Sequence, residues 1–189
     1  EFWKIYFVLT LLIGIGLFSA GMGGFDALAH ALSTSATGGF STRSASIGFW
    51  DNPAIEIVLI FGMILGGASF ALHWRATKER RIPHFKDPEF RAYIGLFTLA
   101  AVAIAWILSS DGLGFGQALR SATFNVVALG TSSGFSNATG DGSSGDFAAW
   151  ASGPQAILFI FLIFGGCTGS TSGGVKVFRL QVGALHALR

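Results

Sequence analysis

The chain has 189 residues, of which 51% are hydrophobic and 12% are charged, and its mean hydropathy is +0.61. The charged share is about half that of a soluble domain, which excludes an ordinary soluble enzyme and a disordered chain and favours a membrane protein with several spanning helices. The single cysteine, Cys167, excludes an internal disulfide and a cysteine-based metal cage.

The first predicted element is a spanning helix over residues 5–19, with Phe2 and Trp3 as interfacial residues before it. Together they approach the length of about 20 residues that crosses a bilayer. Lys4 before the apolar run and small residues after it also resemble a signal peptide. We favour the spanning helix, because the sequence does not begin with Met and because the internal repeat described below requires this segment.

A short, half-polar helix is predicted next, over residues 26–36, followed by a loop that contains glycine. At 1.5 Å per residue this helix is about 16 Å long, which is half a bilayer. A second spanning helix is predicted over residues 53–72, with Pro53 in an early helical position. Residues 75–91 are rich in Lys and Arg and form a predicted cytoplasmic linker.

The second half of the chain begins with a predicted spanning helix over residues 92–108. Its last apolar run, residues 154–164, is too short to span a membrane. Residues 165–174 follow it with five glycines and cannot hold a steady helix, whereas residues 175–188 can resume one. We therefore predict a final helix that is interrupted inside the membrane.

The basic residues predict the orientation of these helices. One side holds ten of the twelve Lys and Arg residues: Lys4, Arg75, Lys78, Arg80, Arg81, Lys86, Arg91, Lys176, Arg179 and Arg189. The other side holds Arg43 and Arg120, among several Asp residues that would attract cations. The positive-inside rule makes the first side cytoplasmic, and a basic linker of this kind is a poor candidate for binding nucleic acid.

An internal repeat organises the chain. Residues 30–41 match residues 125–136 at a constant offset of 95, and residues 66–69 match residues 165–168 at an offset of 99. Each copy reads as a helix, a short half-helix with a loop, and a second helix. The predicted units are residues 1–74, a linker over 75–91, and residues 92–189. Since both ends of each unit are cytoplasmic, each half-helix must re-enter the membrane from outside.

The two re-entrant loops are the candidate site. Irregular backbone at membrane depth is tolerated where it lines a water-filled path, and loop carbonyls can replace the water shell of an ion. A glycine in each loop allows the backbone angles that turn carbonyls inward. No carboxylate lies in either loop, so a monovalent cation suits them better than Mg²⁺ or Ca²⁺. The proposed filter residues are Ala36, Thr37, Gly38, Gly39, Phe40, Thr131, Ser132, Ser133, Gly134 and Phe135.

These two motifs, together with the glycine-rich stretch of residues 165–174, resemble the Trk/Ktr/HKT superfamily of potassium transporters, and specifically its Trk-type membrane subunit. The resemblance covers essentially the whole chain. It implies an all-α membrane fold of helix, re-entrant pore loop and helix repeats, similar to a potassium channel. By their motifs, the two copies here look like the second and third of the four units that the family arranges around one pore. Gly39 and Gly134 match the filter glycine of each unit.

The resemblance also implies function. It predicts potassium uptake across the bacterial plasma membrane, with K⁺ bound by filter carbonyls and no cofactor, and it predicts no enzymatic activity. The intramembrane gating loop that it implies consists of Gly165, Gly166, Cys167, Thr168, Gly169, Ser170, Thr171, Ser172, Gly173 and Gly174. The family works as a homodimer on a cytosolic nucleotide-binding regulatory subunit. The first and fourth units are missing, so we expect a piece of a longer subunit or a chain that pairs with another half.

Alternatives remain open. The chain could be a non-conducting membrane scaffold or an assembly subunit, with the loops serving only to pack helices. An intramembrane hydrolase is a weaker alternative, because its candidate motif, residues 142–145, lies in an outer loop. A phosphate-binding loop is excluded at residues 169–176, because Val175 separates Gly174 from Lys176. The sequence does not rank K⁺ against Na⁺, nor a channel against a coupled transporter.

Overall fold

The computed structural model describes residues 2–79 and 83–187, so Arg80, Arg81 and Arg189 of the topology argument lie outside it. Among the described residues the regular secondary structure is helical, apart from one isolated bridge between Phe164 and Val175, which confirms the predicted all-α class. The helices are α1 (Phe2–Ser19), α2 (Gly24–Ser35), α3 (Pro53–Gly66), α4 (Phe70–Glu79), α5 (Pro88–Ser110), α6 (Phe115–Gly130), α7 (Ser152–Ile163) and α8 (Val177–Ala187). Short 3₁₀ helices lie at Ser46–Phe49, Pro83–Lys86 and Phe147–Ala149.

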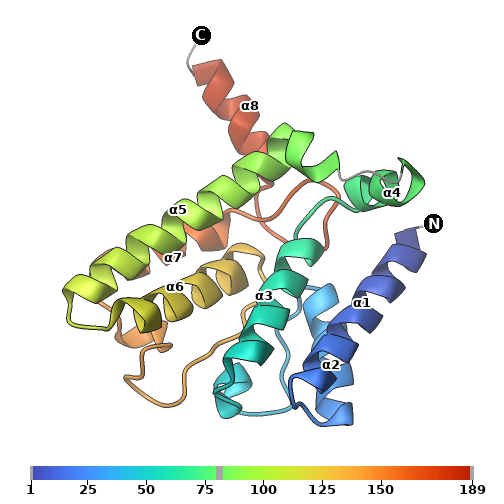
Figure 1. Ribbon diagram of the computed structural model, residues 1–189. Helices are drawn as coiled ribbons and strands as arrows, with labels where there is room; N and C mark the ends of the chain where they lie inside the picture. Colours follow the sequence, from blue (N-terminus) through green and yellow to red (C-terminus); the bar gives the residue numbers. More distant parts are fainter. Residues whose placement is uncertain (1, 80–82, 188–189) are drawn as a thin grey trace.

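The helices form two similar units of three (Figure 1). In the first, α1, α2 and α3 all pack against one another, and in the second α5, α6 and α7 do the same. The half-helices α2 and α6 are therefore each held by two neighbouring helices of their own unit. Contacts between α3 and α6 join the units, so the end of one repeat lies beside the half-helix of the next. This arrangement follows the repeat found in the sequence.

The surface of the long helices is apolar. The helices α1 and α5 are long and apolar enough to cross a membrane, by length and composition. Large apolar side chains are exposed along them, including Leu12 and Phe18 on α1 and Leu99 and Trp106 on α5. An exposed apolar surface of this extent is stable in hydrocarbon rather than in water. The short α7 carries the same kind of surface, with Phe159 and Ile163 exposed.

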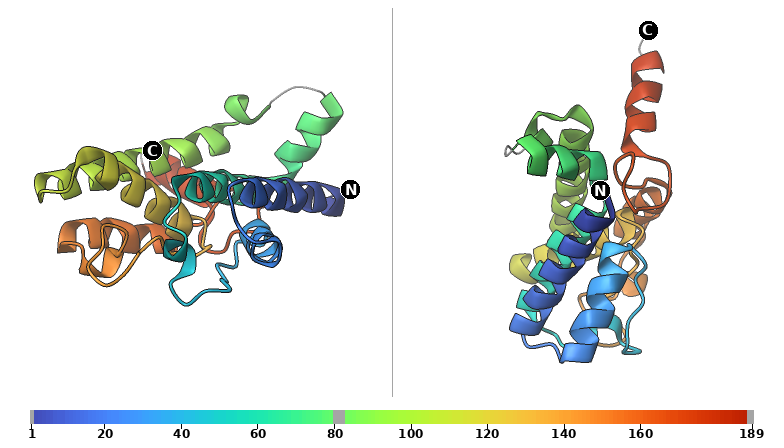
Figure 2. Two further views of the ribbon diagram at one scale, coloured as in Figure 1. Left: turned by 60° about the horizontal axis from the view of Figure 1, so that its bottom comes forward. Right: turned by 90° about the vertical axis from the view of Figure 1, so that its right-hand side faces the viewer.

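The basic segments lie together at one end of the molecule. Figure 1 shows α8 and α4 toward the top, with the N-terminus beside α4, whereas the chain that follows each half-helix runs down to the bottom. Figure 2 shows α8 projecting from the body of the molecule at the same end. The ends of the helices thus separate most of the Lys and Arg residues from the acidic loops, as the charge pattern predicts. Which end faces the cytoplasm remains a prediction.

The second predicted spanning helix, residues 53–72, is corrected by the structure. The helix α3 ends at Gly66, and the chain then turns by 93° into α4. Two glycines at the break have low helix propensity, and Gly67 is packed so closely that a Cβ would lie 2.5 Å from the hydroxyl of Tyr93. Hydropathy alone continues this helix to Leu72, because the residues around the break are themselves apolar.

The predicted linker, residues 75–91, is also more structured than its charge suggests. The helix α4 extends to Glu79, and α5 begins at Pro88. Asp87 precedes α5 and accepts a hydrogen bond from the backbone N–H of Phe90 at 2.9 Å, which is a helix N-cap followed by proline in the first turn. The linker therefore contributes the start of the third long helix.

A histidine pair, His73 and His84, fastens α4 to the linker. His73 Nε2 donates to the carbonyl of Leu65 at 2.9 Å, which leaves its Nδ1 to accept from His84 Nε2 at 3.0 Å. Burial lowers the pKa of both histidines, and the charge of His73 further lowers the pKa of His84. The hydrogen bond from His84 requires an unprotonated Nδ1 on His73, and the lowered pKa of His73 favours this neutral form.

Candidate functional site

The first loop, residues 36–40, begins where α2 ends. The backbone N–H groups of Thr37 and Gly38 donate to carbonyls of the last turn of α2, at 3.0 and 2.8 Å. Thr37 then has φ +49° and Gly39 has φ +67°. Gly38, between them, lies outside the left-handed region. The backbone thus alternates between left-handed and ordinary conformations directly after the half-helix.

The second loop, residues 131–135, repeats this geometry. Ser132 has φ +57° and Gly134 has φ +77°, at the positions that the offset of 95 pairs with Thr37 and Gly39. The N–H of Ser132 donates to the carbonyl of Leu129 at 2.9 Å. The prediction that both glycines need left-handed angles is confirmed. The sequence analysis placed Thr37 and Ser132 in the two loops but missed their left-handed conformation, because threonine and serine give no signal for it.

The two loops touch each other through their backbones. A Cβ built on Gly39 would lie 1.6 Å from the carbonyl oxygen of Ser133 and 3.2 Å from the carbonyl carbon of Gly134. Only glycine fits at this place, for reasons of both space and backbone angle. The residues predicted as filter residues from two distant parts of the sequence therefore meet at one point. A Cβ built on Gly134, in contrast, would have no atom of the described residues within 4 Å.

The two phenylalanines of the loops are not equivalent. Phe135 is 1% exposed and stacks on His30 of the first unit, with ring centroids 5.9 Å apart, whereas Phe40 is 81% exposed. The ring of His30 is fully buried: Nδ1 donates to the carbonyl of Asp26 at 2.7 Å, and Nε2 contacts Ser41 Oγ at 2.9 Å. His30 is thus a satisfied structural residue that fixes the second loop against the first half-helix.

The glycine-rich loop, residues 165–174, lies against the ends of both half-helices. The Thr171 hydroxyl donates to the carbonyl of Ser35, the last residue of α2, at 3.0 Å. The N–H of Gly173 donates to Ser132 Oγ in the second loop at 2.7 Å. The chain segment that interrupts the last helix is therefore in direct contact with both parts of the candidate site.

The break in α3 holds this same loop. The carbonyl of Gly67 accepts from the N–H of Cys167 at 2.8 Å, and the carbonyl of Gly66 accepts from the N–H of Thr171 at 3.3 Å. A Cβ on Gly166 would lie 2.3 Å from the Gly67 oxygen. The bonds from Gly165 to Val175 and from Val175 to Ile163, both 2.9 Å, close the base of the loop. The loop is an ordered element and not an open chain.

An ion cluster joins the two units near the outer loops. Arg120 on α6 donates through Nε and Nη2 to the two oxygens of Glu56 on α3, both at 2.9 Å, and to Asp51 at 2.8 Å. The side chain of Glu56 is only 3% exposed. Arg43 pairs with Asp26 at 2.9 Å. Both arginines on this side are therefore neutralised by neighbouring carboxylates, which leaves the face less repulsive to cations.

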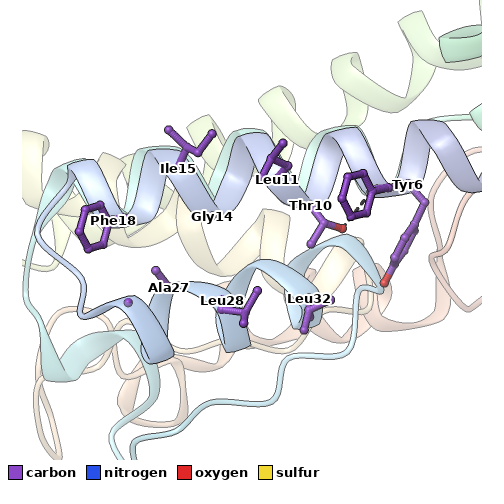
Figure 3. Close-up of a pocket in the computed structure, with 11 residues that line it drawn as sticks. Tyr6, Thr10, Leu11, Gly14, Ile15, Phe18, Ala27, Leu28 and Leu32 are labelled. Carbon is purple, nitrogen blue, oxygen red and sulfur yellow. Dashed lines mark hydrogen bonds between the residues drawn. The ribbon is translucent and has the colours of Figure 1, made fainter.

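An apolar groove of about 390 Å³ runs between α1 and α2, away from the loops (Figure 3). The labelled side chains that line it include Leu11, Ile15 and Phe18 from α1 and Leu28 and Leu32 from α2. No charged residue lines it, and its Thr10 hydroxyl already donates to the carbonyl of Tyr6 at 2.8 Å. The groove suits hydrocarbon and offers nothing to an ion.

The described residues hold no group of three or more His, Cys, Asp or Glu side chains that could bind a metal ion. The ligands available at the candidate site are thus backbone carbonyls and hydroxyls of residues 36–40 and 131–135. Ser143 of the alternative hydrolase motif accepts from the N–H of Thr139 at 3.1 Å within its own outer loop. The chemistry at the junction of the loops fits a weakly hydrated cation.

Known proteins are similar to this chain in sequence and in fold. A family of cation transport proteins, TrkH, matches residues 2–185. The Trk system potassium uptake protein TrkH of Halomonas elongata is 43% identical over 184 residues, and that of Escherichia coli is 36% identical over 185 residues. Each alignment covers 94% of this chain and 36% of the relative, so the chain spans about a third of the length of these relatives.

A solved structure agrees with these matches. The crystal structure of the potassium transporter TrkH from Vibrio parahaemolyticus superposes with a TM-score of 0.90 and 34% sequence identity, over 99% of this chain and 40% of that one. The superposition includes the helices that carry both loops. By its sequence and by its fold, the chain belongs to the TrkH family of cation transport proteins.

Proposed function

We propose that this chain forms part of the ion path of a potassium uptake protein in the plasma membrane. The observation that carries the proposal is the contact between Gly39 and Ser133, where two half-helices deliver two loops with matched left-handed residues to one point. A half-helix directs its negative C-terminal end toward the ion, and the loop carbonyls replace part of the ion's water shell. The names of the relatives, potassium uptake proteins, support K⁺ as the transported ion.

The proposed filter is made of Ala36, Thr37, Gly38, Gly39 and Phe40 with Thr131, Ser132, Ser133, Gly134 and Phe135. Within this set we assign ion binding to the backbone carbonyls. The rings of Phe40 and Phe135 cannot play equivalent roles in the two loops, because the first is exposed and the second is buried. Gly134 faces open space where Gly39 faces a neighbouring loop, so further loops of the same kind would complete the ring around the ion.

The glycine-rich loop is the proposed gate. It contacts Ser35 and Ser132 directly at the inner ends of the two half-helices, where a cation leaving the filter would pass. Five glycines make such a segment easier to displace than a helix. In the resting protein we infer that the loop obstructs the path, and that its displacement allows flux.

The proposed orientation places α4, α8 and the basic residues in the cytoplasm, with the acidic loops outside. The protein is not an enzyme and uses no cofactor, and K⁺ is its substrate. By resemblance to its family, we infer a homodimer that binds a cytosolic nucleotide-binding subunit through these basic surfaces. The helix α8 projects from the body of the molecule (Figure 2), and its exposed Phe178, Val182 and Leu185 form an apolar surface that such a partner would cover.

Two measurements test the proposal. The complete protein should restore growth at low K⁺ to a bacterium that lacks its own uptake systems, and should carry Rb⁺ into proteoliposomes. Correctly folded protein without any Rb⁺ flux would favour the scaffold alternative. Deleting residues 168–172 should raise basal Rb⁺ flux while the preference for K⁺ over Na⁺ stays unchanged. A folded deletion variant that conducts no faster than the parent would make the loop a structural kink.

A further inference from the structure

The carboxylate of Glu89 makes contacts that the proposed function does not explain. Its Oε1 accepts three hydrogen bonds: from the backbone N–H of Thr168 at 2.6 Å, from the Thr168 hydroxyl at 3.0 Å, and from the backbone N–H of Phe178 at 3.1 Å. Thr168 belongs to the glycine-rich loop and Phe178 to the first turn of α8, whereas Glu89 lies in the first turn of α5. One side chain thus connects three elements.

Glu89 serves α8 as a cap supplied from another helix. The first N–H groups of a helix have no partner within it, and a carboxylate near them is stabilised by the helix dipole. Phe178 is the second residue of α8, so its N–H is one of these groups. Bonds to an ionised acceptor are roughly twice as strong as neutral ones. Since α8 projects from the molecule (Figure 2), its attachment depends on the few contacts near its start.

Further hydrogen bonds hold α8 and the part of the loop around Thr168 close to Glu89. Gln181 Nε2 donates to the carbonyl of Pro88 at 3.0 Å, one residue before Glu89. On the other flank of Thr168, Cys167 donates to Gly67 and the carbonyl of Gly169 accepts from Phe70 at 3.0 Å. The part of the loop around Thr168 is therefore held on one side by the α3–α4 turn and on the other by Glu89.

We propose that Glu89 is a positioning residue that couples α8 to the glycine-rich loop. While α8 is docked, the carboxylate keeps Thr168 and the loop against α3. When α8 moves, the shared oxygen cannot keep both partners, and the loop loses its restraint on the α5 side. The coupling rests on the proposed function only for its effect on ion flux. Its structural part, that Glu89 restrains the loop, stands by itself.

Cys167 reports on the loop without any transport measurement. It is the only cysteine of the chain, it is fully buried, and it precedes Thr168. In membranes that contain the complete protein, with any cysteine outside this sequence replaced, its rate of labelling by N-ethylmaleimide measures how often the loop leaves α3. Glu89→Ala should raise this rate about tenfold, the effect of losing hydrogen bonds to a charged group. Glu89→Gln keeps the shape and one acceptor, and should give a smaller rise.

Two further variants separate a specific contact from general loosening. Glu79→Gln, on the exposed i,i+4 pair with Arg75, removes a carboxylate from the same end of the molecule and should leave the rate unchanged. Thr168→Val should raise the rate by itself but add little to Glu89→Ala, because both changes remove the same contact. Full additivity of the two effects would overturn the proposal.

The remaining outcomes are also decisive. Labelling of Cys167 in detergent-denatured protein gives the rate for an unfolded chain. If Glu89→Ala labels at that rate, the variant is unfolded, and the test then depends on whether the isosteric Glu89→Gln labels faster than the parent. A folded Glu89 variant that labels as slowly as the parent overturns the proposal. Rb⁺ flux is measured on the same samples. If labelling rises and flux does not, the coupling stands and the gating part of the proposed function fails.

Discussion

Substituting Gly39 by alanine tests the junction of the two loops most directly. The new Cβ would lie 1.6 Å from the Ser133 carbonyl oxygen, whereas an ordinary contact needs at least 3.4 Å, so one of the two loops must move by about 1.8 Å. The left-handed angle at φ +67° adds about 1–2 kcal/mol for a residue with a side chain. A carbonyl displaced this far no longer contributes to an ion site whose ligands must lie within a narrow distance.

The expected result is a loss of selectivity with little loss of protein. We expect the ratio of Rb⁺ to Na⁺ uptake by proteoliposomes to fall about tenfold or more, which corresponds to about 1.4 kcal/mol. Gly38→Ala is the matched control, since its Cβ would lie 3.3 Å from the exposed ring of Phe40 and its φ is not left-handed. Gly134→Ala should fall between the two, because its φ is +77° but its surroundings are open among the described residues.

The outcome is read only on variants that reach the membrane and elute as the parent does in size-exclusion chromatography. If Gly39→Ala, like Gly38→Ala, then keeps the ion preference of the parent, the contact between the loops is a packing contact. The assignment of residues 36–40 and 131–135 to a filter would be refuted with it.

Three further predictions concern stability and orientation. Arg120→Gln should lower the free energy of unfolding by about 3 kcal/mol, because the buried Glu56 loses its partner. Arg43→Gln, whose side chain is exposed, should lower it clearly less, and equal thermal midpoints of the two variants in detergent would contradict this. The pKa values of His73 and His84 are lowered in the folded state, so the unfolded chain takes up protons first, and the stability present above pH 6.5 should fall as the pH drops below about 6.5. A variant with phenylalanine at both positions should show a flatter pH dependence of its thermal midpoint, and an unchanged slope would exclude the pair as the cause. In a background without the native cysteine, a cysteine at Lys78 should react with an impermeant maleimide only from the cytoplasm and one at Ser143 only from outside; labelling of both from one side would remove the re-entrant topology.

Patterns that depend on composition and repetition were readable from the sequence. The all-α class, both half-helices, the glycine-rich interruption and the left-handed angles at Gly39 and Gly134 follow from apolar runs, from glycine and from a constant offset. Two copies of one motif carry more information than either copy alone, because packing glycines need not recur at matched positions. The short length of residues 154–164 likewise indicated that the last helix is interrupted.

Features that depend on contacts between distant segments were not readable. The end of α3 at Gly66 results from the loop and Tyr93 that pack there, about 30 to 100 residues away along the chain. The burial of Phe135 and the exposure of Phe40 result from a partner, His30, that only the first unit supplies. Glu89 looked like one more charge in a basic linker, and its hydrogen bonds to Thr168 and Phe178 join residues that no local pattern connects.

The two breaks in the helices provide hydrogen-bond partners for each other, as their proposed position inside the membrane would require. Residues 66–69 and 165–168 are matching parts of the repeat, and the helix ends at or near this point in each copy. The break in the first copy frees the carbonyls of Gly66 and Gly67, and that in the second frees N–H groups in the glycine-rich loop. Cys167 and Thr171 donate to those two carbonyls. Because unpaired backbone groups are costly away from water, neither break would be stable without the other. A change that straightens either helix should therefore destabilise the opposite one, and this links the position of the loop to the packing of the first unit.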